Sequence, residues 1–215
     1  MEGATTYLTT KEAEQPPRPF VFDHSFWSHN PSDKHFVTQE KVFNTLGAEV
    51  LDDAFDGFNC CIFAYGQTGS GKSYTMMGSG GEDRGLIPRL CEGLFQRIED
   101  ANSGGGDVWT SKIEVSYMEL YLERVKDLLN PATASTSKTL KVREHKTTGP
   151  YVEDLTSHAV ANFSMINELL DHGDKLRTVR ATSMNDVSSR SHAIFQLVGA
   201  RLLSGAAAPF CFGTG

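Results

Sequence analysis

A glycine-rich turn in the first third of the chain constrains the fold more than any other segment. The stretch FAYGQTGSGKSYTMMG contains Gly66, Gly71, Lys72 and Ser73, which match the pattern G-x-x-x-x-G-K-[ST]. The apolar run CCIFAY at residues 60–65 leads into it. This run is too short for a buried helix and predicts a central strand covered on both faces. A strand, a glycine-rich turn and a helix in this order predict a phosphate-binding loop.

The chemistry of the loop follows from its residue types. Glycines let the backbone fold around phosphate oxygens, so that successive N–H groups and the positive end of the next helix face the anion. Lys72 would contact the β- and γ-phosphates, and the Ser73 hydroxyl would bind Mg²⁺. We therefore predict a nucleoside triphosphate with Mg²⁺ as the ligand. A chance glycine-rich turn is the weaker alternative, because the strand stands where the mechanism needs it.

Composition limits the class of partner. The 215 residues carry a formal net charge of −7, which argues against a general affinity for nucleic acid or for an anionic membrane surface. The sequence has no apolar run of the roughly 20 residues that span a bilayer, and no signal-peptide pattern. Its cysteines lack metal-ligand spacing. These features predict a cytosolic protein. Glu119, Glu123 and Asp127 are interpreted as a solvated face rather than an acid–base pair.

Hydrophobic periodicity predicts that strands and helices alternate. Strands are expected at residues 5–10, 20–26, 60–65, 112–121 and 192–203, with a hairpin formed by LKVRE and PYVEDL. Helices are expected from the N-cap Thr38 to Gly57, from Pro88 to the glycines at 104–106, through 125–129, and over 163–176. The alternation predicts an α/β fold with three layers around a central sheet.

A second polar cluster, NDVSSRSH at residues 185–192, stands directly before the last expected strand. It offers three serine hydroxyls and one guanidinium, which are groups suited to contact a γ-phosphate. Taken alone, the cluster is explained equally well as a loop capped by its own local hydrogen bonds. Beside a phosphate-binding loop, it yields the candidate catalytic residues Ser188, Ser189, Arg190 and Ser191.

These stretches together resemble the kinesin motor domain. The resemblance rests on FAYGQTGSGKSYTMMG, NDVSSRSHAIF, SYMELYLERVKDLL and LKVREHKTTGPYVEDL, and it is strongest over residues 20–197. FWS after FDHS, SYTMMG, and VREH with GPYVEDL are most similar to the third kinesin class, the organelle-carrying, plus-end-directed motors. The resemblance implies a P-loop NTPase-type motor fold with a central mixed sheet. Residues 1–203 would form a partial motor domain, and residues 204–215 a divergent Gly/Ala-rich tail.

The resemblance also implies roles for individual residues. ATP or ADP would be bound by Gly66, Gln67, Thr68, Gly69, Ser70, Gly71, Lys72, Ser73 and Tyr74. The ring of Tyr74 would pack against adenine. The first switch would include Asn185, Ser188, Ser189, Arg190, Ser191 and His192. Within this site, Ser73 and Ser189 would bind Mg²⁺.

The implied partner is the microtubule, and the implied location is the cytoplasmic microtubule cytoskeleton. Candidate contacts with the acidic filament lie around VREH, at Lys141, Arg143 and His145 together with Lys138 and Lys146. A solvated basic loop without a partner is the alternative for this region, since exposed charges contribute little affinity without a packed centre.

The sequence also departs from the family pattern. It contains no R-x-R-P motif and no D-L-A-G-S-E segment, the second switch that would supply a carboxylate to Arg190. We therefore expect a motor domain truncated at both ends that binds nucleotide, hydrolyses it slowly or not at all, and is doubtful as a motor. The last strand would lack neighbours and leave Ile194 and Phe195 uncovered.

Two other functions remain open from the sequence. A non-enzymatic interaction or regulatory protein could keep this fold in order to pair with, or compete against, complete motors. An unrelated P-loop kinase or GTPase is the more distant alternative, because the sequence has no guanine-reading N-K-x-D segment.

Overall fold

The computed structural model describes residues 3–9, 16–103, 110–130, 139–147, 149–183, 191–202 and 209–213. Its elements are, in chain order, β1 (Thr5–Leu8), β2 (Arg18–Val21), α1 (Gln39–Val42), a π-helical segment (Phe43–Gly47), α2 (Ala48–Phe55), β3 (Cys60–Cys61), α3 (Lys72–Met76), a 3-10 turn (Gly81–Asp83), α4 (Leu86–Ser103), β4 (Thr110–Tyr121), β5 (Arg124–Asp127), β6 (Val142–His145), β7 (Gly149–Val152), β8 (His158–Val160), α6 (Phe163–Ser183), β9 (Ser191–Leu202) and β10 (Pro209–Gly213).

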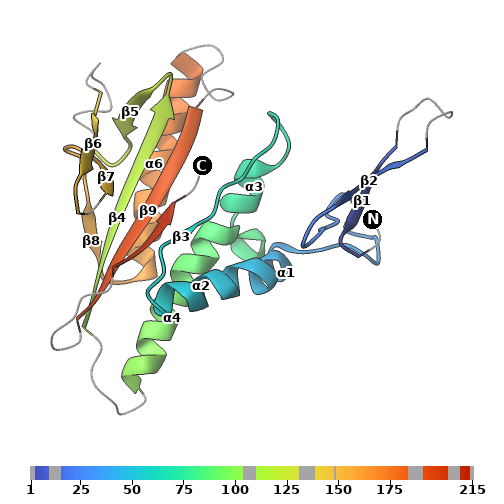
Figure 1. Cartoon of the computed structure of the whole chain (residues 1–215), viewed down its shortest axis with the longest axis horizontal. Coiled ribbons are helices and arrows are strands. Elements are labelled where there is room, and N and C mark those ends of the chain that lie inside the picture. Colours follow the sequence, from blue (N-terminus) through green and yellow to red (C-terminus); the bar gives the residue numbers. More distant parts are fainter. Residues whose placement is uncertain are drawn as a thin grey trace.

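A mixed sheet with the strand order β3-β10-β9-β4-β5 forms the centre, and β8 pairs with β4 beside this path. Strands β4 and β9 are antiparallel along their whole length, from Thr110 opposite Leu202 to Tyr121 opposite Ser191. Strand β10 runs antiparallel to β9 and parallel to β3. Figure 1 shows β4 and β9 as the longest strands, with the β1–β2 hairpin projecting away from the sheet. The expected α/β fold with a mixed sheet is confirmed.

The main core lies on one face of this sheet. Alternate residues Ile113, Val115 and Tyr117 of β4 point to that face and join one buried cluster with Leu94 of α4 and Leu170 of α6. Helix α2 belongs to the same cluster, so these helices share one layer. None of the helices in the described ranges is long and apolar enough to cross a membrane.

A smaller cluster lies on the opposite face of β4. Its buried members are Met118, Val125 and Leu140, packed against the partly buried Leu120, Val152, Leu155 and Ile194. The β6–β7 hairpin is attached here, because the Leu140 amide donates to the Val125 carbonyl over 2.9 Å. The buried Asp127 carboxylate accepts from the amides of Leu129 and Thr156, each over 2.8 Å. The hairpin is therefore joined to the sheet through β5.

Most helix predictions are confirmed. Thr38 is the N-cap of α1, and its side chain accepts from the Lys41 amide over 3.2 Å. Pro88 lies in the first turn of α4, where its missing N–H costs nothing. Helix α6 continues to Ser183, seven residues beyond the expected end at 176. The β6–β7 hairpin is also confirmed.

The expectation of a central strand at residues 60–65 is wrong. Only Cys60 and Cys61 pair with a neighbour, and β3 lies at the edge of the sheet as far as the structure describes it. The side chains of Phe63 and Tyr65 are 71% and 95% exposed. An apolar run is buried on both faces only where strands and helices flank it on both sides, and here β10 is its one described sheet neighbour.

The helix expected through residues 125–129 is also wrong, because this segment begins with strand β5. Leu122 and Glu123 adopt left-handed conformations, with φ of 47° and 61°, and form a two-residue turn between β4 and β5. This turn type reverses a strand with the twist that a hairpin needs. Val125 and Asp127 then point inward at the period of two that is typical of a strand.

The first two strands are shorter than expected. Strand β1 ends at Leu8, and β2 occupies Arg18–Val21 rather than residues 20–26. This strand contains Pro19, which lies outside the expected range. A proline is tolerated because β1 is the single described partner of β2, which leaves the other edge of β2 free of ladder bonds.

The expectation that β9 lacks neighbours is wrong as well. Strand β9 lies between β4 and β10, and β10 falls within the expected tail at 204–215. Phe195 is 1% exposed and meets the ring of Tyr117 edge to face, with ring centroids 5.7 Å apart. Ile194 packs against the smaller cluster on the other face. Both side chains are therefore covered.

Candidate phosphate-binding site

The glycine-rich loop leads directly into α3. Gly71 is the N-cap of this helix and has φ of 94°, and Gly69 has φ of 79°. Residues that carry a Cβ rarely adopt such positive φ angles. The turn therefore needs glycine at these two positions for the backbone conformation, since no neighbouring atom would crowd a side chain there. A Cβ at Gly66 would lie 2.4 Å from the Ser70 hydroxyl oxygen, so the Ser70 side chain would have to move to admit one. The positive φ values of Gly69 and Gly71 therefore set the shape of the turn.

The Lys72 ammonium folds back over this loop. Its Nζ donates to the Gly66 carbonyl over 2.7 Å and to the Gln67 carbonyl over 2.9 Å. A further backbone bond from the Ser70 amide to the Gln67 carbonyl, of 3.1 Å, closes the turn. The positive charge therefore lies at the start of the loop, beside the Gly66 and Gln67 carbonyls.

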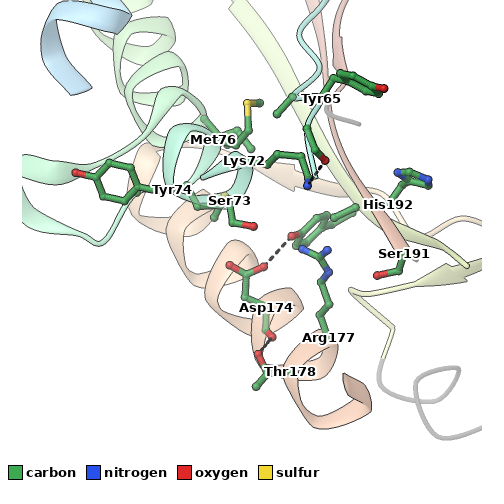
Figure 2. Close-up of a pocket in the computed structure, with 17 residues that line it drawn as sticks. Tyr65, Lys72, Ser73, Tyr74, Met76, Asp174, Arg177, Thr178, Ser191 and His192 are labelled. Carbon is green, nitrogen blue, oxygen red and sulfur yellow. Dashed lines mark hydrogen bonds between the residues drawn. The ribbon is translucent and has the colours of Figure 1, made fainter. Parts of the chain in front are cut away.

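A cavity of about 700 Å³ opens beside α3. Its wall combines residues from six segments. Those with polar side chains are Tyr65, Lys72, Ser73, Tyr74, Tyr117, Asp174, Arg177, Thr178, Ser191 and His192. Figure 2 shows Ser73 and Asp174 facing each other across this space, while the Tyr74 ring points away from them. The Ser191 hydroxyl oxygen is buried and finds no hydrogen-bond partner among the described residues. Such an orphaned group favours a polar ligand.

The far wall of the cavity is a polar network between β4 and α6. The Tyr117 hydroxyl donates to Asp174 Oδ1 over 2.7 Å. The guanidinium of Arg177 lies 3.6 Å from the buried Glu119 carboxylate. Burial raises the pKa of Asp174 above its ordinary value, although the Tyr117 hydrogen bond and the Arg177 charge oppose this shift. Burial likewise raises the pKa of Tyr117, so its hydroxyl remains protonated at neutral pH.

The structure brings together part of the expected site. Gly66, Lys72, Ser73, Tyr74 and Ser191 line the cavity, and His192 lies beside them. Gln67, Thr68, Gly69, Ser70 and Gly71 form the turn that precedes α3. Asn185, Ser188, Ser189 and Arg190 lie outside the described residues.

Lys141, Arg143, His145 and Lys146 are exposed on and beside strand β6, away from the cavity wall. Arg143 forms an ion pair of 3.2 Å with Glu153. Lys138 lies outside the described residues.

Sequence reasoning missed the network on the far wall. The solvated face expected for Glu119, Glu123 and Asp127 is wrong for two of them, because Glu119 and Asp127 are 2% and 1% exposed. Glu119 follows the alternation of Ile113, Val115 and Tyr117, so the period of two placed its carboxylate on the buried face. No local signal identified its partners on α6.

The strand, the glycine-rich loop with its lysine and the helix that follows have the arrangement of the P-loop class. A sequence model of the kinesin motor domain matches residues 2–201. The chain therefore belongs to the kinesin motor domain family.

Several characterised proteins are similar to this chain. Kinesin-related protein 1 of Dictyostelium discoideum is 58% identical over 179 residues, which are 83% of this chain and 8% of that protein. Kinesin-like protein unc-104 of Caenorhabditis elegans is 53% identical over 200 residues, or 92% of this chain and 12% of that protein. Kinesin-like protein KIF1A of Rattus norvegicus is 51% identical over 201 residues, which are 92% of this chain and 11% of that protein. These relatives confirm the resemblance to the third kinesin class.

Solved structures are similar as well. KIF14 with ADP in complex with a microtubule has a TM-score of 0.82 and 38% sequence identity, covering 100% of this chain and 61% of that one. A KIF14 dimer with AMP-PNP in complex with a microtubule has a TM-score of 0.79 and 37% identity, covering 99% of this chain and 62% of that one. The chain thus spans less than two thirds of these motor structures and a small part of the curated relatives.

The raised pKa of Asp174 predicts a pH effect on stability. The folded chain binds this proton more readily than the unfolded chain, so Asp174 destabilises the fold at neutral pH. The penalty disappears as pH falls through the raised pKa toward the ordinary value of 3.8. We expect Asp174→Asn to melt at a higher temperature than the unmodified chain at pH 7, with a difference that narrows as pH falls. Thermal melts of both proteins, from pH 7 down to the ordinary pKa of an aspartate, measure this difference in melting temperature.

The exposed Asp23 provides the control. Asp23→Asn should leave the melting temperature within the error of the unmodified chain at every pH. A difference for Asp174→Asn that widens on acidification would contradict the account of the cavity wall.

Proposed function

We propose that residues 1–203 form the nucleotide-holding part of a microtubule motor domain, and that they bind ATP or ADP with Mg²⁺ in the cavity beside α3. One observation carries the proposal: Lys72 and Ser73 of α3 line the same cavity at the end of the glycine-rich loop as Ser191 of β9, which is distant in the sequence. Membership of the kinesin family supports nucleotide as the ligand.

The phosphates would lie on the loop from Gly66 to Ser73. The Lys72 ammonium now satisfies two carbonyls, and a triphosphate would offer it stronger, charged acceptors in the same region. Tyr74 follows directly and is 45% exposed, which leaves its ring accessible for stacking on adenine. The similarity to KIF14 structures with ADP and with AMP-PNP supports an adenine nucleotide.

The donor set fits Mg²⁺ bound through phosphates. The described residues contain no cluster of three His, Cys, Asp or Glu side chains that could hold a metal alone. Mg²⁺ prefers oxygen ligands and commonly keeps waters while it bridges substrate phosphates. Ser73 and Ser189 would each supply a hydroxyl, and the orphaned hydroxyl of Ser191 lies in the same cavity. When bound, the ion would neutralise phosphate charge.

The first switch would contact the γ-phosphate through Ser188, Ser189, Arg190 and Ser191. Hydrolysis in P-loop proteins depends on charge stabilisation and on a positioned water. The 215 residues contain no D-L-A-G-S-E segment to pair with Arg190 or to enclose the γ-phosphate. For a polypeptide of this sequence we propose nucleotide binding with slow or absent turnover, and movement along the filament only for a complete motor domain.

The β6–β7 hairpin is the proposed microtubule contact, which places the protein on the cytoplasmic microtubule cytoskeleton. Lys141, Arg143 and His145 are exposed along it, and Asp127 holds its connection to the sheet through two short hydrogen bonds. Exposed lysine and arginine side chains that are held in place in this way are complementary to an acidic filament surface. The microtubule complexes of KIF14 support this partner.

Nucleotide binding is tested by titrating the purified chain with Mg-ATP and Mg-ADP. Lys72→Ala removes charge-assisted hydrogen bonds to phosphate and should weaken binding by about 10- to 100-fold. The matched control is Lys112→Ala, because Lys112 is exposed on β4 outside the cavity wall. The proposal fails if Lys72→Ala binds as tightly as the unmodified chain, or if the unmodified chain binds neither nucleotide.

Microtubule contact is tested by co-sedimentation at low salt. Lys141→Glu reverses one charge on the proposed contact and should weaken binding by about 2- to 10-fold, an effect that added salt reduces. Lys34→Glu is the matched control, because it reverses one charge at an exposed loop position outside the hairpin. Equal losses from the two substitutions would show that net charge alone, and not this hairpin, governs binding.

A further inference from the structure

One polar side chain outside the phosphate loop is buried against the backbone of α3. Gln39, the first residue of α1, is 6% exposed. Its Nε2 donates to the carbonyl oxygen of Tyr74 over 2.5 Å, across 35 positions of sequence. Only the amide nitrogen of glutamine can pair with a carbonyl, so the donor is unambiguous. The bond joins α1 to α3, two helices that are separated in the sequence.

Helix α3 depends on such outside support. It has only five residues, and a helix this short is unstable without tertiary contacts. The last carbonyls of a helix have no partner within the helix. Here the Met77 and Gly78 amides both donate to the Ser73 carbonyl, over 2.8 and 3.4 Å. The Tyr74 carbonyl instead accepts a hydrogen bond from the side chain of Gln39. Gln39 therefore acts as a cap for α3 from a neighbouring helix.

The bond ends on Tyr74, which stands between Ser73, proposed to act near the phosphates, and the proposed adenine contact of the Tyr74 ring. Ser73 faces Asp174 across the cavity, while the ring of the next residue, Tyr74, points away from both (Figure 2). The proposed ligand would have its phosphates at Ser73 and its adenine at the Tyr74 ring. Rotation about φ of Tyr74, as when the last turn of α3 unwinds, would move its ring and leave the Gly71 end of α3 in place. The Gln39 hydrogen bond opposes that rotation, because breaking it would leave a part-buried carbonyl unpaired.

We propose that Gln39 is a positioning residue for the nucleotide base. It holds the Tyr74 backbone so that the ring is preorganised for stacking, and it thereby sets the affinity for the adenine part of the ligand without affecting the phosphates. This inference rests on the proposed function of the same site. It assigns base recognition to a residue of α1, which lies outside the phosphate loop and the cavity wall.

The test compares Mg-ATP with inorganic Mg-tripolyphosphate, which presents the phosphates without a base. Gln39→Leu keeps the size of the side chain but removes its donor. It should weaken Mg-ATP binding by about 3- to 20-fold and change tripolyphosphate binding less than twofold. Tyr74→Ala should give the same pattern, and the double variant should lose no more than Tyr74→Ala alone, because both act through one ring.

Glu40→Gln, at the exposed next position of α1, is the matched control and should bind both ligands normally. Thermal melting of each variant reports folding. Should Gln39→Leu fail to fold, Gln39→Asn serves instead, since its amide is one methylene too short to reach Tyr74. Equal loss of both ligands would mean a merely structural role and would overturn the inference, as would unchanged Mg-ATP binding. If the unmodified chain binds neither Mg-ATP nor Mg-tripolyphosphate, both the proposed function and this inference are wrong.

Discussion

The antiparallel pairing of β4 with β9 is the constraint on which the rest of the structure depends. Each strand has 12 residues, and the ladder runs without a gap from Thr110 to Tyr121. A slip of one residue would turn every side chain to the opposite face. The observed register places Tyr117 against Phe195 in the core and brings Ser191 beside Tyr121, at the end of the strand that reaches the cavity. One ladder therefore fixes both the core and a wall of the site.

Close packing of α6 on β4 completes that wall. A Cβ at Gly173 would lie 2.2 Å from a ring carbon of Tyr117, so only glycine permits this approach. The next residue, Asp174, then comes within hydrogen-bond reach of the Tyr117 hydroxyl. Buried polar groups are costly unless they are paired, and pairing makes them rigid. The Tyr117–Asp174 bond and the ion pair of Arg177 with Glu119 thus give the cavity a defined shape on the side opposite Ser73.

The sequence allowed local features to be predicted, and distant pairings escaped it. The glycine-rich turn before α3, the Thr38 cap and the β6–β7 hairpin depend on neighbouring residues, and the sequence predicted each of them. The strand β5 was missed because its turn uses left-handed Leu122 and Glu123, which are unusual residues for that conformation. Asp174 lies 57 positions from Tyr117, so no window of sequence could reveal their bond. The exposure of Tyr65 likewise reflects which strands lie beside β3, and hydrophobicity carries no such information.

We propose that the glycine-rich loop and α3 form the phosphate site in this chain as it stands. Hydrogen exchange of the backbone amides, with and without Mg-ADP, is the decisive test. We expect slower exchange in a peptide covering residues 66–76 when Mg-ADP is present, with no change in a peptide covering β2 at residues 18–21. Unchanged exchange over 66–76 at saturating nucleotide, or protection confined to other segments, would contradict it.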